Sequence, residues 1–296
     1  MTESDVDVSV IVAVRNGAAT LAQCIDSVLA QAACNVELVI VDAMSDDGTK
    51  EIVESYGDAI AVYIREADSG IYDAWNKALA VARGEWCSFL GADDYYVDAT
   101  SVAKLITSAD EAGEPPAFVY GGIIRIGGDE DYIVHPEPID ELQFLRKGRM
   151  LPHPGSLHRV SLLRRIGGFD ASFRIAGDFD ALIRLLSHGD ARRCAELVTV
   201  MRIGGVSGDI RMNRLRHAER WTILRQEVGV LKAALRVALP MGLEVAGFLV
   251  EVVLTRLLGE RRGSRATLLM RRRLGRAPRL SRIGAASTKS SGASNC

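Results

Sequence analysis

Apolar runs and helix-period segments alternate along the N-terminal third of the chain. Four apolar runs that end in polar residues predict buried strands over 8–14, 36–43, 60–66 and 85–94. The segments between them repeat apolar residues at the helical period and predict helices over 20–31, 45–57 and 69–84. Strands that alternate with helices over short connections are typical of a parallel, doubly wound α/β sheet.

Polar clusters follow all four predicted strands. They are Arg15-Asn16, Asp42, Arg65 to Asp68, and Asp93-Asp94. The carboxyl ends of parallel strands meet at one edge of the sheet, and ligands bind in the crevice there. Strand-end loops are often polar for solvation alone, but four such clusters at one edge favour a binding site.

The alternation weakens from about residue 100. The run 117–126 predicts a strand interrupted by two glycines, and 194–205 predicts a late strand. Between them, 151–159 is expected to be a loop with two His and two Pro, and an amphipathic helix is expected from about Asp178.

The C-terminal part of the chain has a different pattern. Residues 211–260 predict helices, and the stretch 229–259 is mostly apolar. Five charged residues and Pro240 interrupt that stretch, so no part of it between successive charges is long enough to span a bilayer. We expect an amphipathic helix pair that packs on the domain or lies in a membrane interface. The tail, 261–296, is basic and then Ser/Gly-rich, which is typical of disorder at its end.

The formal net charge of −2 is distributed unevenly. From Arg256 to the end, eleven Lys and Arg face one acid, Glu260, so this segment carries +10 and residues 1–255 carry −12. A basic tail suits anionic lipid or nucleic acid. Because the acidic body opposes nucleic acid, we expect no nucleic acid as partner. An anionic membrane surface is one interpretation of the tail, and a solvated tail on a helical dimer interface is the alternative.

The cysteines bear on the compartment. The five cysteines form no CxxC pair, which argues against a zinc site or a redox motif. An odd, scattered set is typical of reduced thiols in a cytosolic protein. The acidic N-terminus differs from the basic start of an export signal. We expect a cytoplasmic protein, peripheral on the inner face of the cell membrane.

Asp93 and Asp94 repel each other, so a neighbouring group must compensate their charges. A divalent cation suits such a pair, because Mg²⁺ takes one or two carboxylates together with substrate phosphates. The alternative is a cap or turn that leads into a helix near Asp98, and the dipeptide alone favours this alternative.

Asp42 ends an apolar run, where its carboxylate can accept hydrogen bonds from a base or a ribose. The alternative is a cap for the helix after Gly48. The chain has no GxGxxG after its first strand and no GxxxxGK[ST] anywhere. A dinucleotide-binding Rossmann enzyme and a P-loop NTPase are therefore both disfavoured.

Five segments carry a family resemblance: VSVIVAVRNGAATLAQCIDSVLAQ, VELVIVDAMSDDGT, READSGIYDAWNKALAVARGEW, FLGADD and GGFDASFRIAGDFDALIRL. In this order and spacing the chain resembles the family 2 glycosyltransferases with the GT-A fold, from about Val8 to Gly205. It looks closest to the branch that builds bacterial polysaccharides and other surface glycans.

The resemblance implies a GT-A domain over 1–210, with a nucleotide-sugar half and an acceptor half that meet at about residue 98. Beyond it, the residue pattern predicts a helical extension over 211–260, packed on the domain or associated with a membrane, and the basic tail over 261–296.

The resemblance also implies donor contacts at the strand ends. Val14, Arg15, Asn16 and Asp42 match the positions that hold the base and ribose, and Arg65 and Asp68 match the loop over the nucleotide. Ala92-Asp93-Asp94 matches the metal and sugar-nucleotide motif, but Gly91 replaces its usual leading Asp. Asp93 and Asp94 would share the ribose and the metal, Mg²⁺ or Mn²⁺, and Asp94 is our candidate metal ligand.

On the acceptor side, family members often carry Glu-Asp where this chain has Gly177-Asp178. Asp178 is our candidate general base, and an N-cap for its helix is the alternative. His153 matches a segment near the acceptor and is a second catalytic candidate, although a lone His is more often structural. His158 is expected to be structural.

The resulting hypothesis is an inverting glycosyltransferase that uses a UDP- or GDP-sugar. The acceptor is expected to be a saccharide, lipid-linked in surface polysaccharide synthesis, and an oligomer is compatible with the sequence. A sugar nucleotidyltransferase is one alternative, although VRNGAAT is poor in the glycine and base that such enzymes use. A non-catalytic membrane or nucleic-acid binder acting through the basic tail is the other, and it leaves the strand-end carboxylates unexplained.

Overall fold

The computed structural model describes residues 5–111, 113–127, 131–203, 212–230, 232–233 and 281–282 of the chain. The strands are β1 (Val8–Val14), β2 (Val36–Asp42), β3 (Val62–Arg65), β4 (Trp86–Gly91), β5 (Tyr95–Tyr96), β6 (Phe118–Ile126), β7 (Tyr132–Val134), β8 (Leu157–Arg159), β9 (Ala191–Arg202) and β10 (Ser281–Arg282). The helices are α1 (Leu21–Leu29), α2 (Thr49–Ser55), α3 (Ile71–Val81), α4 (Ser101–Asp110), α5 (Glu141–Arg146), α6 (Val160–Arg165), α7 (Gly177–Leu186) and α8 (Asn213–Val228).

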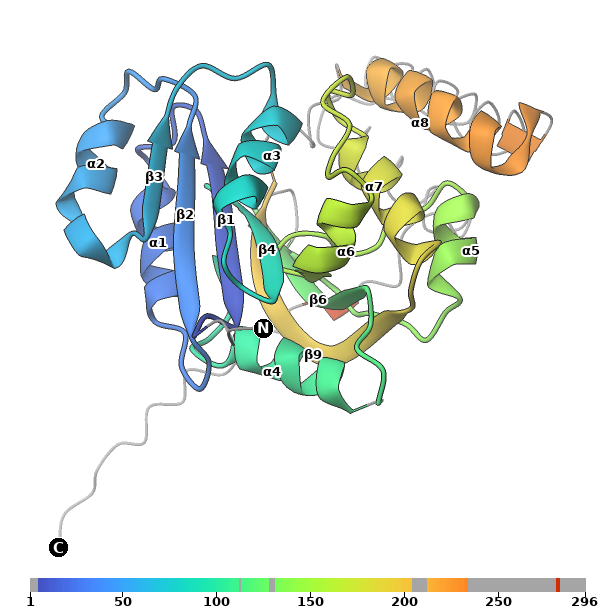
Figure 1. Cartoon of the computed structure of the whole chain (residues 1–296), viewed down its shortest axis with the longest axis horizontal. Coiled ribbons are helices and arrows are strands. Elements are labelled where there is room, and N and C mark those ends of the chain that lie inside the picture. The colour runs from blue at the N-terminus through green and yellow to red at the C-terminus, as the bar shows by residue number, and fades with distance from the viewer. Residues whose placement is uncertain are drawn as a thin grey trace, which may run out of the picture.

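The strands form one mixed sheet in the order β10-β7-β6-β8-β4-β1-β2-β3, and β9 pairs with both β6 and β5. The four neighbouring strands β4, β1, β2 and β3 are all parallel, which confirms the predicted doubly wound half. In the second half, β8 runs antiparallel to both β4 and β6, whereas β9 runs parallel to β6. Figure 1 shows β9 as a long curved strand, so the sheet is curled.

Helices cover both faces of the sheet because successive strand residues point to opposite sides. Val8, Val10 and Val12 of β1 pack with α1, α2 and α4 in one hydrophobic cluster. Ile11 of β1 packs with α3, α6 and α7 in a second cluster on the other face. This two-sided packing is what makes the β1 and β2 runs almost continuously apolar.

The two glycines within β6, Gly121 and Gly122, lie where β9 approaches closely. A Cβ at Gly121 would lie 2.6 Å from Val198, and a Cβ at Gly122 would lie 2.6 Å from Leu197. The β6–β9 register shifts at this point, as in a β-bulge. β6 itself runs unbroken through both glycines, so the prediction of an interrupted strand was wrong, and only the pairing with β9 is disturbed.

The prediction that 151–159 is entirely loop was wrong at its end. Leu157–Arg159 forms β8, because β4 and β6 both offer it hydrogen-bonding edges. A three-residue strand has too short an alternation to show in sequence.

Among the described residues, no helix is long and apolar enough to cross a membrane. Most of the apolar stretch 229–259 lies outside the described residues, so the expected amphipathic pair is not tested. Of the basic tail, only β10 is described, and it pairs antiparallel with β7. The four described cysteines are free thiols, as expected.

Candidate functional site

The carboxyl ends of β1 to β4 meet at one edge of the sheet. Val14 pairs in register with Asp42, and Asp42 with Arg65, while β4 ends beside Ala13. The polar clusters predicted at these ends therefore come together, as the parallel topology requires.

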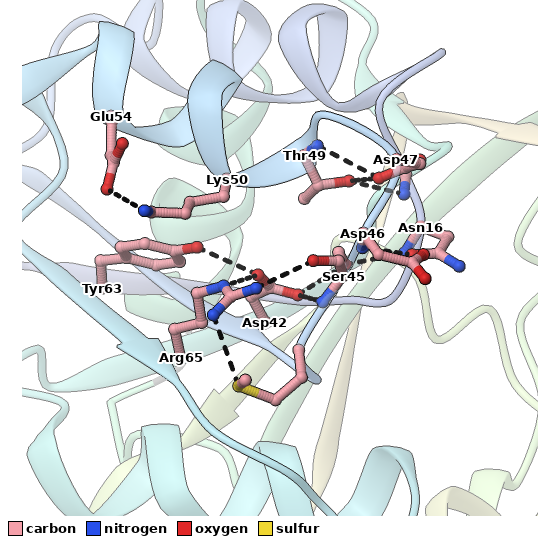
Figure 2. A network of polar contacts seen from close by, with 12 residues as sticks. Asn16, Asp42, Ser45, Asp46, Asp47, Thr49, Lys50, Glu54, Tyr63 and Arg65 are labelled. Carbon is pink, nitrogen blue, oxygen red and sulfur yellow. Dashed lines mark hydrogen bonds and ion pairs between the residues drawn. The ribbon is translucent and has the colours of Figure 1, made fainter.

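Asp42 is completely buried and is paired on both carboxylate oxygens. Its Oδ1 accepts hydrogen bonds from the N–H and the hydroxyl of Ser45 at 2.8 and 2.5 Å. Its Oδ2 accepts from the Tyr63 hydroxyl at 3.0 Å and lies 3.2 Å from Arg65 Nε, so β3 and the loop after β2 both contact it (Figure 2). Asp42 thus holds the strand ends together, and its contact with a base or ribose stays a prediction.

The interpretation of Asp42 as a helix cap was wrong. Asp47 instead accepts from the N–H of Thr49, the first residue of α2, at 3.1 Å. Its second oxygen accepts from Ala18 N–H at 3.0 Å, which ties the loop after β2 to the loop after β1.

Asn16 lies between the same two loops. Its N–H donates to Ser45 Oγ at 2.8 Å, and its side-chain oxygen accepts from Asp46 N–H at 3.1 Å (Figure 2). Its φ of 56° lies in the left-handed region, which Asn tolerates better than most residues. Val14, two residues before Asn16, has its side chain buried in the core.

Arg15 and Asp68 face the same edge from the loops after β1 and β3. Burial raises the pKa of the Asp68 carboxyl, and the positive charges of Lys77 and Arg15 oppose that rise. Asp68 also accepts a hydrogen bond from Gly70 N–H at 3.0 Å, which holds its loop ahead of α3. All the predicted nucleotide-binding residues therefore lie along one edge.

Asp93 and Asp94 occupy the turn that follows β4. Asp94 N–H donates to Gly91 O at 2.9 Å, and Arg202 N–H of β9 donates to Asp94 Oδ1 at 3.0 Å. Burial and, second, the charge of Asp93 together raise the pKa of Asp94 to about 7, against the opposing backbone hydrogen bonds and the Arg125 guanidinium. The turn interpretation is confirmed.

The cap interpretation of the pair was wrong. β5 separates Asp94 from α4, which begins at Ser101 with Thr100 as its N-cap, and the carboxylate beside that helix start is Asp98. Asp98 accepts hydrogen bonds from the N–H and the hydroxyl of Thr100, both at 2.8 Å.

The space around Gly91 is filled, which fits the absence of the usual Asp at this position. A Cβ at Gly91 would lie 2.7 Å from Asp94 Oδ2 and 2.8 Å from Asp93 Oδ1. Both carboxylates therefore lean over the Gly91 backbone. A side chain at this position would displace them.

The converging oxygens of Asp93 and Asp94 fit a divalent cation. Among the described residues, no three His, Cys, Asp or Glu side chains form a ready-made metal site. Mg²⁺, however, usually takes one or two carboxylates and completes its shell with water and substrate phosphates. A cation would also relieve the repulsion that contributes to the raised pKa of Asp94.

Asp178 lies in the first turn of α7, against α3. Its Oδ1 accepts from the Tyr72 hydroxyl at 3.2 Å and from Phe179 N–H at 2.8 Å. The N-cap of α7 is Ala176, so the interpretation of Asp178 as N-cap was wrong. No described residue donates a hydrogen bond to Asp178 Oδ2, which leaves that oxygen able to accept a proton.

The Tyr72 ring also fits the presence of Gly177 where the resemblance would place the Glu of a Glu-Asp pair. A Cβ at Gly177 would lie 2.7 Å from two carbons of the Tyr72 ring. The tyrosine ring fills the space into which a side chain at 177 would extend. Its hydroxyl contacts the Asp that remains.

His153 is buried beside this carboxylate. Its ring stacks on Trp75, with centroids 5.4 Å apart. Burial lowers its pKa and the Asp178 charge opposes that effect, so a neutral imidazole is favoured. Within the described part of the chain, no hydrogen-bond partner reaches the buried Nε2. His153 therefore lies near enough to be affected by the Asp178 charge, and its catalytic role stays a prediction.

His158 belongs to the core, as expected. It lies on β8 between Phe89 and Phe118, with ring centroids 5.2 and 4.8 Å away. Burial lowers its pKa well below the usual range.

Comparison with known proteins identifies the chain. A family model described as Glycosyl transferase family 2 matches residues 9–182, more than half of the chain. The chain belongs to glycosyl transferase family 2. It is therefore a nucleotide-sugar-dependent glycosyltransferase, and not a nucleotidyltransferase or a non-catalytic binder.

Individual relatives of the glycosyltransferase agree. A PGL/p-HBAD biosynthesis glycosyltransferase of Mycobacterium bovis is 34% identical over 190 residues, which cover 61% of this chain and 70% of that protein. An uncharacterized glycosyltransferase of Rickettsia typhi is 30% identical over 187 residues, which cover 60% of this chain and 58% of that protein.

Solved structures confirm the GT-A fold. S. aureus TarS 1-349 in complex with UDP-GlcNAc matches with a TM-score of 0.57 at 18% identity, over 78% of this chain and 70% of that chain. The mannosyltransferase PcManGT from Pyrobaculum calidifontis, in complex with GDP-Man and Mn²⁺, matches with a TM-score of 0.55 at 18% identity, over 91% of this chain and 88% of that chain. At this identity the likeness shows the fold alone.

Sequence analysis of the glycosyltransferase missed several residues that build the site. They are Ser45 and Tyr63 around Asp42, Tyr72 beside Asp178, and Arg202 beside Asp94. Tyr63 had a usable signal, because it precedes Arg65 by two residues and so shares its face of β3. Tyr72 and Arg202 had none, because their partners are 106 and 108 residues away.

Proposed function

We propose that this enzyme is a metal-dependent, inverting glycosyltransferase that moves a sugar from UDP or GDP to an acceptor hydroxyl. The observation that carries the proposal is the convergence of the Asp93 and Asp94 side chains at the nucleotide edge, next to the buried loop of His153. The N–H of Gly155 donates to Phe89 O at 3.0 Å, so that loop runs along the end of β4. The charge of Asp178 acts on buried His153 and opposes the lowering of its pKa, which supports an acceptor side near this loop.

Asp178 is the general base in this mechanism. Its Oδ2 takes the proton from the acceptor hydroxyl while Oδ1 stays bonded to Tyr72, which fixes the orientation of the carboxylate. The acceptor oxygen forms a bond to the anomeric carbon. The bond from that carbon to the diphosphate oxygen breaks on the opposite face, so the configuration inverts.

Asp93 and Asp94 would hold the divalent cation. When bound, the cation supplies positive charge that stabilises the diphosphate leaving group. Asp42, Arg65 and Asn16 keep the strand ends and their loops in place around the nucleotide.

Asp178→Asn tests the base. Because a positioned base contributes about 10²–10⁴-fold in rate, this variant should lose nearly all transfer while its donor affinity changes less than about twofold. Near-normal turnover of the variant would refute the assignment.

Calorimetric titration of UDP and GDP, with and without Mn²⁺, tests the donor site. One nucleotide should bind in a metal-dependent way to the wild type and at least about tenfold more weakly to Asp94→Ala. Asp98→Ala is the matched control, because Asp98 pairs with Lys104 on the surface of α4. Metal-independent binding, or binding that survives in Asp94→Ala, would contradict the metal assignment.

We further propose a lipid-linked saccharide as acceptor, on the cytoplasmic face of a membrane. The support is the +10 charge from Arg256 onward, since each Lys or Arg near an anionic surface contributes about 1 kcal/mol. Flotation with anionic liposomes should be lost when residues 256–296 are removed. Equal flotation of the truncated chain would remove this argument.

A further inference from the structure

Helix α8 places a buried carboxylate on the segment that leads into α7. Glu219 accepts hydrogen bonds from three consecutive backbone N–H groups: Arg174 at 2.8 Å, Ile175 at 3.0 Å and Ala176 at 2.9 Å. It is only 8% exposed, and no described Lys or Arg forms an ion pair with it. A carboxylate is costly to bury without partners, so these N–H groups are what keeps it there.

The next residue of α8 holds the other side of the same turn. The Arg220 guanidinium lies over the Phe179 ring, 5.1 Å from its centroid. Arg220 also donates to Gly148 O at 3.3 Å. Glu219 and Arg220, here called the α8 clasp, therefore contact the residues before and directly after Asp178.

The start of α7 depends on this contact. Its N-cap, Ala176, offers no side-chain cap, and Gly177 adds no side chain of its own. The unpaired N–H groups at a helix start need an acceptor. Glu219 accepts from the N–H of the N-cap, Ala176, and of the two residues before it, so α8 anchors the segment that enters α7.

We propose that the α8 clasp is a positioning element of the acceptor side, which sets the place and orientation of Asp178. The proposal rests on the proposed function, in which Asp178 is the base. The clasp lies outside the residues that match the family model, which end at 182.

The test is a double-mutant cycle on the full-length chain. Turnover is measured as release of UDP from UDP-GlcNAc or of GDP from GDP-mannose in Mn²⁺, with water as acceptor. Glu219→Ala should lower kcat about 10–100-fold and leave the donor KM within about threefold, because misplacing a catalytic group by about 1 Å costs up to about 10²-fold. Glu219→Gln keeps one acceptor oxygen and is the milder change for folding. Its kcat should lie between those of the wild type and Glu219→Ala.

The same change in the Asp178→Asn background decides how Glu219 acts. Because residues that work as a unit are not additive, Glu219→Ala should then change kcat less than about twofold. Glu227→Gln is the matched control on α8, since Glu227 lies 3.7 Å from Arg146 and should leave kcat unchanged.

Hydrogen–deuterium exchange gives a readout that does not need turnover. The amide protons of residues 174–178 should exchange faster in Glu219→Ala and as in the wild type in Glu227→Gln. An unchanged kcat, an equal loss in both backgrounds or unchanged exchange at 174–178 would overturn the proposal. Failure of the proposed function is distinguishable, because wild-type turnover by Asp178→Asn alone would refute the base without any change at Glu219.

Discussion

At the scale of single residues, the site contains buried carboxyl groups in contrasting surroundings. Asp42 has donors on both oxygens, whereas Asp94 has a backbone donor on Oδ1 and the neighbouring charge of Asp93. Burial without enough donors disfavours the charged form, and this raises the pKa of Asp94 to about 7. Asp94 is thus suited to bind a cation and poorly suited to stay ionised alone.

Asp94→Asn should stabilise the metal-free protein at alkaline pH. The folded pKa of Asp94 lies above its usual 3.8, so its ionisation costs stability as pH rises from about 4 through about 7. The variant should melt on the order of 5 °C higher than the wild type at pH 8, and the gap should shrink toward pH 5. Mn²⁺ should raise the melting temperature of the wild type only. A pH-independent gap would contradict the assignment.

Tyr72→Phe should lower kcat about tenfold and leave donor affinity unchanged. The change removes only the hydroxyl that donates to Asp178 Oδ1, and a hydrogen bond to a charged group contributes about 1.5–3 kcal/mol. Tyr56→Phe is the control, because it removes a similar bond to Asp26 between α1 and α2. If the two variants had equal kcat, the Tyr72 hydroxyl would have no part in catalysis.

At the scale of elements, close approaches decide which residues each connection tolerates. The turn from β4 to β5 brings two carboxylates over Gly91, and the start of α7 brings Gly177 against the Tyr72 ring. At both positions the chain has glycine where the family resemblance led us to expect an acid. In each case a neighbouring side chain occupies the space, so both departures follow from packing.

Gly91→Asp should weaken metal-dependent nucleotide binding, although it restores the usual family residue. Its Cβ would displace both carboxylates, and overpacking of this kind costs about 1–3 kcal/mol, or roughly tenfold in affinity. Gly91→Ala adds the Cβ without the charge and should show most of the same loss. Tighter binding by Gly91→Asp, measured calorimetrically, would show that the turn can rearrange.

At the scale of the whole molecule, the C-terminal segment shares the main hydrophobic core. Ile223 and Leu224 of α8 and Ala233 beyond it are buried in the cluster that holds α3, α6 and α7. Figure 1 shows α8 lying over the α7 side of the molecule. The sequence predicts a domain boundary at 210. A chain that ended there would lack these contacts.

A chain ending at residue 210 should therefore be less stable than one ending at 233. Removing α8 exposes apolar side chains of α5 and α7 and leaves the N–H groups of 174–176 without Glu219. Each fully buried Leu or Ile contributes about 1.5–3 kcal/mol, so the shorter chain should melt at least about 5 °C lower. Equal melting temperatures in thermal denaturation would mean that 1–210 is an independent unit.

The sequence by itself determined the alternation of β1 to β4 with their helices and the edge at which Arg15, Asp42, Arg65 and Asp94 meet. These follow from local periodicity and from the parallel topology that it implies. Only the tertiary structure decided what each carboxylate touches. Tyr63 reaches Asp42 across 21 residues, Tyr72 reaches Asp178 across 106, and Glu219 reaches the start of α7 across 43 to 45. Such bonds depend on how strands and helices pack, which no local pattern records.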